Sequence, residues 1–235
     1  MLVAALAVLL YRDFREPPES ADRRNEFERI YSKGLWARDI LGKGTSGAGS
    51  TLAATRVYRT YLQDFLAENR IRSVVDAGCG DWEFSQAIDW TGIDYVGLDI
   101  VPSVIAENQR RFGAAKVRFA VADIVRDELP QADLLLVKDV LQHLSNADIA
   151  RFLAQLPRYR HVLLVNDVHP DTLSAEPADT PTGRYRPLDP TRPPYSLPGA
   201  KMLVWRHGPA VKLVVYLKRA DEPALGDPAR PTAQK

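Results

Sequence analysis

The sequence predicts an α/β fold, namely a doubly wound, mostly parallel sheet of seven strands with helices on both faces. Two observations predict this fold class. From Ile71 onward, short apolar runs alternate with amphipathic stretches, which is the pattern of parallel strands connected by helices. After a proline-rich stretch, two further apolar runs flank a turn at His207, Gly208 and Pro209, and they predict a terminal antiparallel hairpin.

The chain of 235 residues is long enough for one domain, which we place at residues 25–220. An apolar and charged extension at 1–24 precedes this domain, and a tail at 221–235 has a composition that predicts disorder. Within the domain we expect N-terminal helices at 25–68, a core at 71–166, a proline-rich excursion over the surface at 168–200 and the hairpin at 201–219.

The expected elements follow from hydrophobic periodicity and from end signals. Strands are predicted at 72–76, 94–99, 117–122, 133–138, 161–166, 201–206 and 211–219. Helices are predicted at 25–32, 51–68, 83–89, 102–112 and 146–156, with a charged connector at 12–25 before the first. Ser50 or Thr51 is placed to cap the second helix, and Pro102 suits the first turn of the fourth. The apolar face of the second helix is expected at Val57, Tyr61, Leu62, Phe65 and Leu66.

Composition excludes several classes of function. The net charge of +1 gives no electrostatic footprint for nucleic acid, so no nucleic-acid partner is expected. Cys79 is the only cysteine, which excludes an internal disulfide and a cysteine-based metal cluster, and no metal site is expected. We expect a cytoplasmic protein. Residues 1–11 are almost wholly apolar but shorter than the roughly 20 residues of a membrane span, which leaves packing on the domain or a peripheral membrane contact.

The strongest motif is a predicted buried strand that ends at Asp76 and is followed by Gly78, Cys79 and Gly80. Glycines at this point let the backbone approach a ligand at the carboxyl edge of the sheet. A dinucleotide-binding loop would have a third glycine at position 83, where this chain has Glu83.

Acidic residues around this turn indicate what kind of ligand it binds. Asp76 and Asp81 would repel a pyrophosphate but suit a cationic amino group. The next strand ends at Asp99, which is placed to accept hydrogen bonds from ribose hydroxyls. The turn therefore favours a cationic nucleoside over a dinucleotide.

The stretches VVDAGCGDW, YVGLDIV and VADI resemble the cofactor motifs of the class I S-adenosylmethionine-dependent methyltransferases, a Rossmann-like family. The resemblance covers residues 71–166 and implies S-adenosylmethionine as the cofactor. It implies that Asp76, Gly78 and Gly80 line the methionine part. It also implies that Asp99 binds the ribose and Asp123 the adenine amine, and we expect Cys79, Ile100 and Ile124 beside them.

The stretch LLLVKDVLQHL resembles the substrate-side motif of the same family, in which Lys138 and Asp139 face the cofactor and His143 opens the next helix. More narrowly, Trp36 with Ser46 to Ser50, and Arg186 to Asp189 with Pro193 to Tyr195, resemble flanking segments of small bacterial methyltransferases. This resemblance implies that both flanks fold over the pocket as a lid, with Trp36 and Ser50 at the cofactor. A flexible linker is the alternative for the glycine-serine stretch.

The resemblance implies methyl transfer by in-line displacement to an oxygen or nitrogen of a small molecule or saccharide. A hydroxyl acceptor needs a base, and the candidates are His143, then Asp139, then His169. The alternative for His143 is a helix-start residue bonded to the backbone. Tyr195, Arg186 and His169 are candidates for substrate binding, together with Arg184 and Arg192, and solvated charge is the alternative for the arginines. His161 is expected to be structural.

Three acceptor classes are disfavoured by missing residues. Cytosine C5 methylation needs a cysteine after the fourth strand, but Cys79 is in the cofactor loop. Adenine amino methylation needs an N-P-P-[FY] motif where this chain has Lys138, Asp139 and Val140, and arginine methylation needs a loop of paired glutamates that is missing. A protein amine methyltransferase, a non-catalytic binding module and a nucleotide-dependent enzyme on a related fold remain as alternatives.

Overall fold

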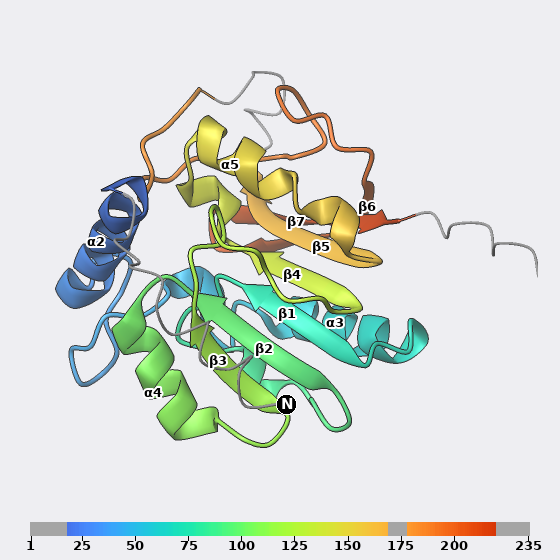
Figure 1. Cartoon of the computed structure of the whole chain (residues 1–235), viewed down its shortest axis with the longest axis horizontal. Helices are drawn as coiled ribbons and strands as arrows, with labels where there is room; N and C mark the ends of the chain where they lie inside the picture. Colours follow the sequence, from blue (N-terminus) through green and yellow to red (C-terminus); the bar gives the residue numbers. More distant parts are fainter. Residues whose placement is uncertain (1–17, 169–177, 220–235) are drawn as a thin grey trace, which may run out of the picture.

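The computed structural model describes residues 18–168 and 178–219, and its centre is a seven-stranded sheet (Figure 1). The strand order is β3-β2-β1-β4-β5-β7-β6. Strands β1 to β5 pair in parallel, whereas β7 pairs antiparallel with both β5 and β6. The strands are β1 Ser73–Ala77, β2 Asp94–Asp99, β3 Val117–Val121, β4 Leu134–Lys138, β5 His161–Val168, β6 Ala200–His207 and β7 Ala210–Lys218. The predicted sheet and terminal hairpin are confirmed.

Helices cover both faces of the sheet, as β4 shows most clearly. Leu134 and Leu136 belong to the same buried cluster as α3, whereas Leu135 and Val137 belong to the cluster that contains α5. Successive side chains of a strand point to opposite faces, so this alternation separates two cores. The helices are α2 Pro18–Lys33, α3 Arg56–Glu68, α4 Pro102–Phe112 and α5 Asn146–Leu153. Single 3-10 turns are η2 Ala48–Ser50, η3 Ser85–Ala87, η4 Leu141–His143 and η5 Leu156–Arg158.

The helix predicted at 83–89 is wrong, because only the turn η3 forms there. Trp82, Phe84, Ile88 and Trp90 are all buried, and a helix of this length would turn some of them toward solvent. Trp82 has a φ of 58°, and the indole N–H of Trp90 donates to the carbonyl of Ser85. Burial of all four apolar side chains outweighs local helical spacing.

The helix predicted at 146–156 is too long, since α5 ends at Leu153 and the turn η5 follows. Pro157 explains this end, because it lacks a backbone donor and restricts the residue before it. The start was predicted correctly, and Ser145 caps it by accepting the backbone N–H of Asp148.

Two N-terminal predictions also need correction. Helix α2 begins at Pro18, so much of the expected connector at 12–25 is helical. Helix α3 begins at Arg56, because Thr51 accepts the N–H of Ala54 and caps a separate turn upstream. Tyr58 rather than Val57 faces the core of α3.

Several expectations concern residues outside the described ranges. These are the apolar run 1–11, the tail 221–235, His169 and part of the excursion at 168–200. Among residues 18–168 and 178–219, no helix is both long and apolar enough to cross a bilayer.

Candidate functional site

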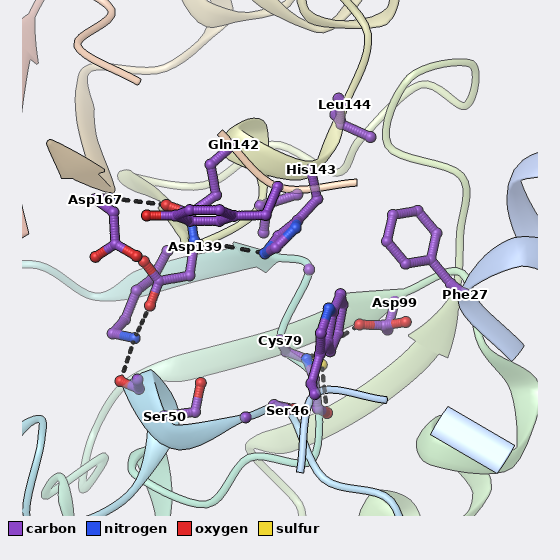
Figure 2. Close-up of a pocket in the computed structure, with 18 of the residues that line it drawn as sticks. Phe27, Ser46, Ser50, Cys79, Asp99, Asp139, Gln142, His143, Leu144 and Asp167 are labelled. Atoms are coloured by element: carbon purple, nitrogen blue, oxygen red, sulfur yellow. Dashed lines mark hydrogen bonds and ion pairs between the residues drawn. The ribbon is translucent and has the colours of Figure 1, made fainter. Parts of the chain in front are cut away.

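A cavity of about 410 Å³ lies at the carboxyl edge of the parallel strands (Figure 2). The chain leaves the sheet at β3 and returns at β4 on the other side of β1, and such reversals of strand order are where α/β sheets bind ligands. The volume falls within the range of roughly 300–1,000 Å³ that holds small ligands. The cavity lining includes all the expected cofactor residues and both leading base candidates: Trp36, Ser50, Asp76, Gly78, Cys79, Gly80, Asp99, Ile100, Asp123, Ile124, Lys138, Asp139 and His143.

The glycine turn after β1 has a backbone that only glycine adopts easily. Gly78 and Gly80 have φ values of 83° and 55°. A Cβ at Gly78 would lie 2.4 Å from a methyl carbon of Val140, and one at Gly80 would lie 2.2 Å from the Ser46 hydroxyl oxygen. The N–H groups of Gly78 and Cys79 both donate to the carbonyl of Leu98, which ties the turn to β2.

Two buried carboxylates stand at this end of the cavity. Asp76 accepts the hydroxyl of Tyr95 at 2.6 Å, and Asp99 accepts the backbone N–H groups of Gly80 and Val101 at 3.1 and 3.0 Å. Burial raises the pKa of each to about 6, although the hydrogen bonds that each accepts act to lower it. Ionising these groups in the free protein is therefore costly, and a cationic ligand with hydroxyl donors would offset the cost.

The glycine-serine stretch is docked on this turn. The Ser46 N–H donates to a carboxylate oxygen of Asp81, and the N–H of Asp81 donates back to the Ser46 hydroxyl. The hydroxyl of Tyr31 on α2 lies 2.8 Å from the same Ser46 oxygen. The stretch is therefore fixed to the cavity wall, and the flexible-linker alternative fails.

Helix α2 reaches the far end of the cavity. One carboxylate oxygen of Asp123 accepts the Ser20 hydroxyl at 2.7 Å and two N–H groups of Arg23 at 2.6 and 3.1 Å. Arg23 also donates to Asp148, whose other oxygen accepts the Thr182 hydroxyl. The carboxylate expected at the adenine amine is thus shared with an arginine, a partner that no local pattern indicates.

Four charged side chains form a buried network at the ends of β4, β5 and β7. Asp139 accepts Lys138 at 2.5 Å and Lys212 at 2.7 Å, and Lys212 also pairs with Asp167 at 2.7 Å. Burial acts to raise the pKa of Asp139, but the two lysines outweigh it and lower the pKa. Lys138 also donates to the carbonyl of Gly49, which binds the glycine-serine stretch to the network. Two lysines and two aspartates leave it without net charge.

His143, the last residue of η4, lies beside Asp139 of this network (Figure 2). Its ring packs against the indole of Trp36 in a tilted arrangement, with an interplanar angle of 38° and centroids 4.9 Å apart. Its Nδ1 lies 3.1 Å from the carbonyl oxygen of Arg184, and its Nε2 lies 3.4 Å from the side-chain nitrogen of Gln142. Burial lowers the pKa of His143. It is not the first residue of a helix, since α5 starts at Asn146.

Comparisons with known proteins agree with this geometry. A family model described as a methyltransferase domain matches residues 74–160. A magnesium-protoporphyrin O-methyltransferase from Rhodobacter capsulatus is 30% identical over 168 residues, which cover 66% of this chain and 74% of the relative. The chain belongs to the class I S-adenosylmethionine-dependent methyltransferases.

Solved structures share the fold of this methyltransferase. Magnesium protoporphyrin IX methyltransferase from Synechocystis PCC 6803 with bound S-adenosylhomocysteine has a TM-score of 0.61 at 16% identity, over 86% of this chain and 100% of that one. An N-methyltransferase from Bradyrhizobium japonicum with the same ligand has a TM-score of 0.54 at 14% identity. The match covers 69% of this chain and 86% of that one.

The methyltransferase uses S-adenosylmethionine, whose positively charged sulfur activates the methyl carbon for transfer. The buried carboxylates fit this molecule. Asp76 and Asp99 are acceptors with raised pKa values in a cavity wall, and the cofactor carries an ammonium group, a sulfonium and ribose hydroxyls. Ile100 and Ile124 add apolar surface to the lining of the cavity.

Sequence reasoning missed several lining residues of the methyltransferase. Lys212 and Asp167 were missed, although a lysine within the apolar run AVKLVVYL is a signal that it has a buried charged partner. Arg23, Phe27 and Tyr31 on α2 line the cavity without such a signal. Tyr185, from the excursion, also lines it.

Two residues expected at the substrate lie elsewhere. Arg186 and Tyr195 are not among the cavity-lining residues. Arg186 donates to the carbonyls of Ala178 and Leu144, and Tyr195 donates to the side chain of Asn146. Tyr195 thus fastens the excursion to the first residue of α5, and Arg186 fastens it to Leu144, just before that helix. His161 bonds Tyr216 at 2.8 Å, in agreement with a structural role.

Proposed function

We propose that the enzyme methylates a hydroxyl oxygen of a small-molecule or saccharide acceptor, with His143 as the base that takes the acceptor proton. The observation that carries the proposal is the fixed tautomer of this histidine. A carbonyl oxygen can only accept, so the proton of neutral His143 lies on Nδ1, which donates to Arg184. The lone pair is left on Nε2, and a lowered pKa keeps the ring neutral near pH 7.

Gln142 supports the same assignment. Its side-chain oxygen accepts the backbone N–H of Asp167 at 2.7 Å, which turns its amide nitrogen toward Nε2 of His143. The separation of 3.4 Å makes this a weak bond that an acceptor hydroxyl can replace. A base near neutral pKa typically contributes about 10²- to 10⁴-fold to the rate.

The cofactor is proposed to lie along the ends of β1, β2 and β3. Asp76 would bind its amino group, Asp99 its ribose and Asp123 its adenine amine, the last beside Arg23. This arrangement directs the methyl group toward the ends of β4 and β5, where His143 stands. Alignment of the two reactants and exclusion of water are expected to supply most of the rate enhancement, about 7 to 11 kcal/mol in well-oriented systems.

Asp139 is proposed as a positioning residue rather than the base. Both of its oxygens accept lysine ammonium groups, and its pKa is lowered, so it is a poor proton acceptor near pH 7. Through Lys138 it holds the glycine-serine stretch at the cavity wall.

An acceptor screen tests the proposal. Labelled S-adenosylmethionine is incubated with phenols, saccharides, tetrapyrrole carboxylic acids and lysine-containing peptides. A hydroxyl acceptor is expected among the phenols and saccharides, and the O-methyltransferase relative supports an oxygen acceptor. Transfer only to the carboxylic acids would contradict the role of His143 as base. Transfer only to peptides would support the protein amine alternative. Binding of the cofactor with no transfer to any class would support a non-catalytic module.

A further inference from the structure

The loop between α2 and the glycine-serine stretch carries two aliphatic side chains in full contact with water. Ile40 and Leu41 have exposed fractions of 101% and 87%, the largest among the large hydrophobic residues of 18–168 and 178–219. Figure 1 shows this loop in blue, projecting from the edge of the molecule near α4. Single exposed aliphatic residues are common on protein surfaces, but two adjacent residues at the tip of a projecting loop form a compact apolar point.

Hydrogen bonds within the loop fix the backbone conformation that exposes these two side chains. The side chain of Asp39 accepts the N–H groups of Leu41 and Lys43 at 2.9 and 2.8 Å, and its own N–H donates to the carbonyl of Lys43. The guanidinium of Arg38 donates to the carbonyls of Gly42 and Lys33 across the base of the loop. These bonds fix the backbone of the tip while leaving its two apolar side chains outward.

Positive charge surrounds the tip. Lys33, Arg38 and Lys43 lie on both sides of it and are all exposed. The negative groups that face them are Asp39 and Glu107, and Glu107 on α4 lies 3.8 Å from Lys43 but is bonded twice by Arg110. With Arg110 included, four basic side chains stand against two acidic ones. The tip is therefore surrounded by an excess of positive charge.

We propose that the Ile40–Leu41 tip inserts into the surface of an anionic lipid bilayer, with the surrounding lysines and arginines at the level of the headgroups. An apolar point within a basic rim is complementary to a membrane whose surface is negative and whose interior is apolar. Long basic side chains keep their charge in water while their aliphatic stems follow the apolar groups inward. An anionic protein surface would satisfy the rim but would leave the two aliphatic residues without an apolar counterpart.

The position of the loop gives this contact a role for the enzyme. Trp36 and Ser46, at the two ends of the loop, both line the cofactor cavity. Ile40 and Leu41 are therefore separated by only a few residues from a cavity-lining residue on either side. A bilayer that binds them would lie close to the cavity. Membrane docking would hold the cavity close to acceptors that partition into lipid.

Vesicle co-sedimentation of the full chain tests the proposal. Vesicles of phosphatidylcholine alone are compared with vesicles that also contain phosphatidylglycerol. We expect binding to the anionic vesicles, weakened by 0.5 M NaCl, and a partition coefficient about tenfold lower for the double variant Ile40→Ser and Leu41→Ser. The matched control is Met202→Ser with Val204→Ser on β6, whose side chains are 47% and 60% exposed, and it should bind as the parent chain does.

A fluorescent label shows which residues enter the bilayer. An environment-sensitive dye is attached through Leu41→Cys or, as the control, through Val204→Cys, because the one natural thiol, Cys79, is buried. Anionic vesicles should shift the emission of the first label to shorter wavelength and leave the second unchanged.

Three results would overturn the proposal. The first is no binding of the parent chain to anionic vesicles. The second is binding that the tip variant retains in full, which would assign the contact to other residues such as 1–11. The third is a dimer in solution that the tip variant loses, which would assign the tip to a second copy of the chain. Unchanged affinity of the tip variant for S-adenosylmethionine shows that it is folded, and all these outcomes are independent of acceptor chemistry.

Discussion

The imidazole Nδ1 of His143 lies 3.1 Å from the backbone carbonyl oxygen of Arg184, a residue of the proline-rich excursion. One side chain of the core thus has its tautomer set by a segment that lies 41 residues further along the chain. Under the proposed function, the excursion therefore takes part in orienting the base.

Replacement of His143 by Asn should lower kcat about 10²- to 10⁴-fold while leaving the affinity for S-adenosylmethionine within about twofold. The rate falls because the variant has no side chain that can accept the proton of the acceptor, and the affinity is kept because the proposed cofactor-binding residues are unchanged. Single-turnover rates and calorimetric titration separate the two effects. The control is His161→Gln, which removes a buried histidine remote from the cavity and should change stability more than kcat.

The pH dependence of the rate follows from the same residue. Burial lowers the pKa of His143 from its ordinary value of 6.5, so the neutral, proton-accepting form predominates at pH 7. Activity should be lost as the pH falls through this lowered pKa, not as it rises. The acid limb of the kcat profile should disappear in His143→Asn, and a profile with the same limb in that variant would contradict the assignment.

The variant Asp99→Ala should weaken binding of S-adenosylmethionine by about 1 to 3 kcal/mol, because the ribose hydroxyls lose a buried acceptor. Titration calorimetry measures the change. Asp94→Ala is the matched control, since Asp94 begins the same strand at the opposite end and is exposed. Equal affinities for the two variants, both folded, would contradict a role for Asp99 in cofactor binding.

The variant Gly78→Ala should be less stable than the parent enzyme and should lose cofactor binding. Its Cβ would lie 2.4 Å from Val140, in a backbone conformation that already costs a non-glycine residue about 1 kcal/mol or more. Gly92→Ala separates these two costs, because Gly92 has a similar φ of 80° with no atom within 4 Å. Thermal unfolding should show a larger loss for Gly78→Ala, and only that variant should fail to bind.

The variant Lys212→Met should lower the free energy of unfolding by about 3 to 5 kcal/mol, since Asp139 and Asp167 lose a buried cation. Urea unfolding measures it. Lys218→Met, an exposed lysine on the same strand, should be nearly neutral. Adding Asp167→Asn to Lys212→Met should recover part of the loss, because Asp167 is the carboxylate that loses its lysine, whereas Asp139 still pairs with Lys138.

The central strands of the sheet were predictable because β4 and β5 are buried on both faces. Leu134 to Val137 form a continuous apolar run for this reason, and the acids that follow the strands mark the edge where ligands bind. The glycine turn was predictable as well, since its backbone requires glycine at Gly78 and Gly80.

The remaining features depend on partners distant in the sequence. The first half of α2 is charged and lacks an apolar stripe, and its burial depends on Arg23 meeting Asp123 a hundred residues later. Lys212 meets Asp139 across 73 residues. Local periodicity carries no information on such pairs, so the α2 wall and the charged network could not be derived from it.

Asp148 limits which segments of this enzyme can be exchanged with those of its relatives. One of its oxygens accepts Arg23 from the segment before the core, and the other accepts Thr182 from the excursion after β5. The two flanks thus share one carboxylate. A chimera that exchanges only one flank would bring an unmatched partner to this carboxylate, so the two flanks should be inherited, and engineered, as a pair.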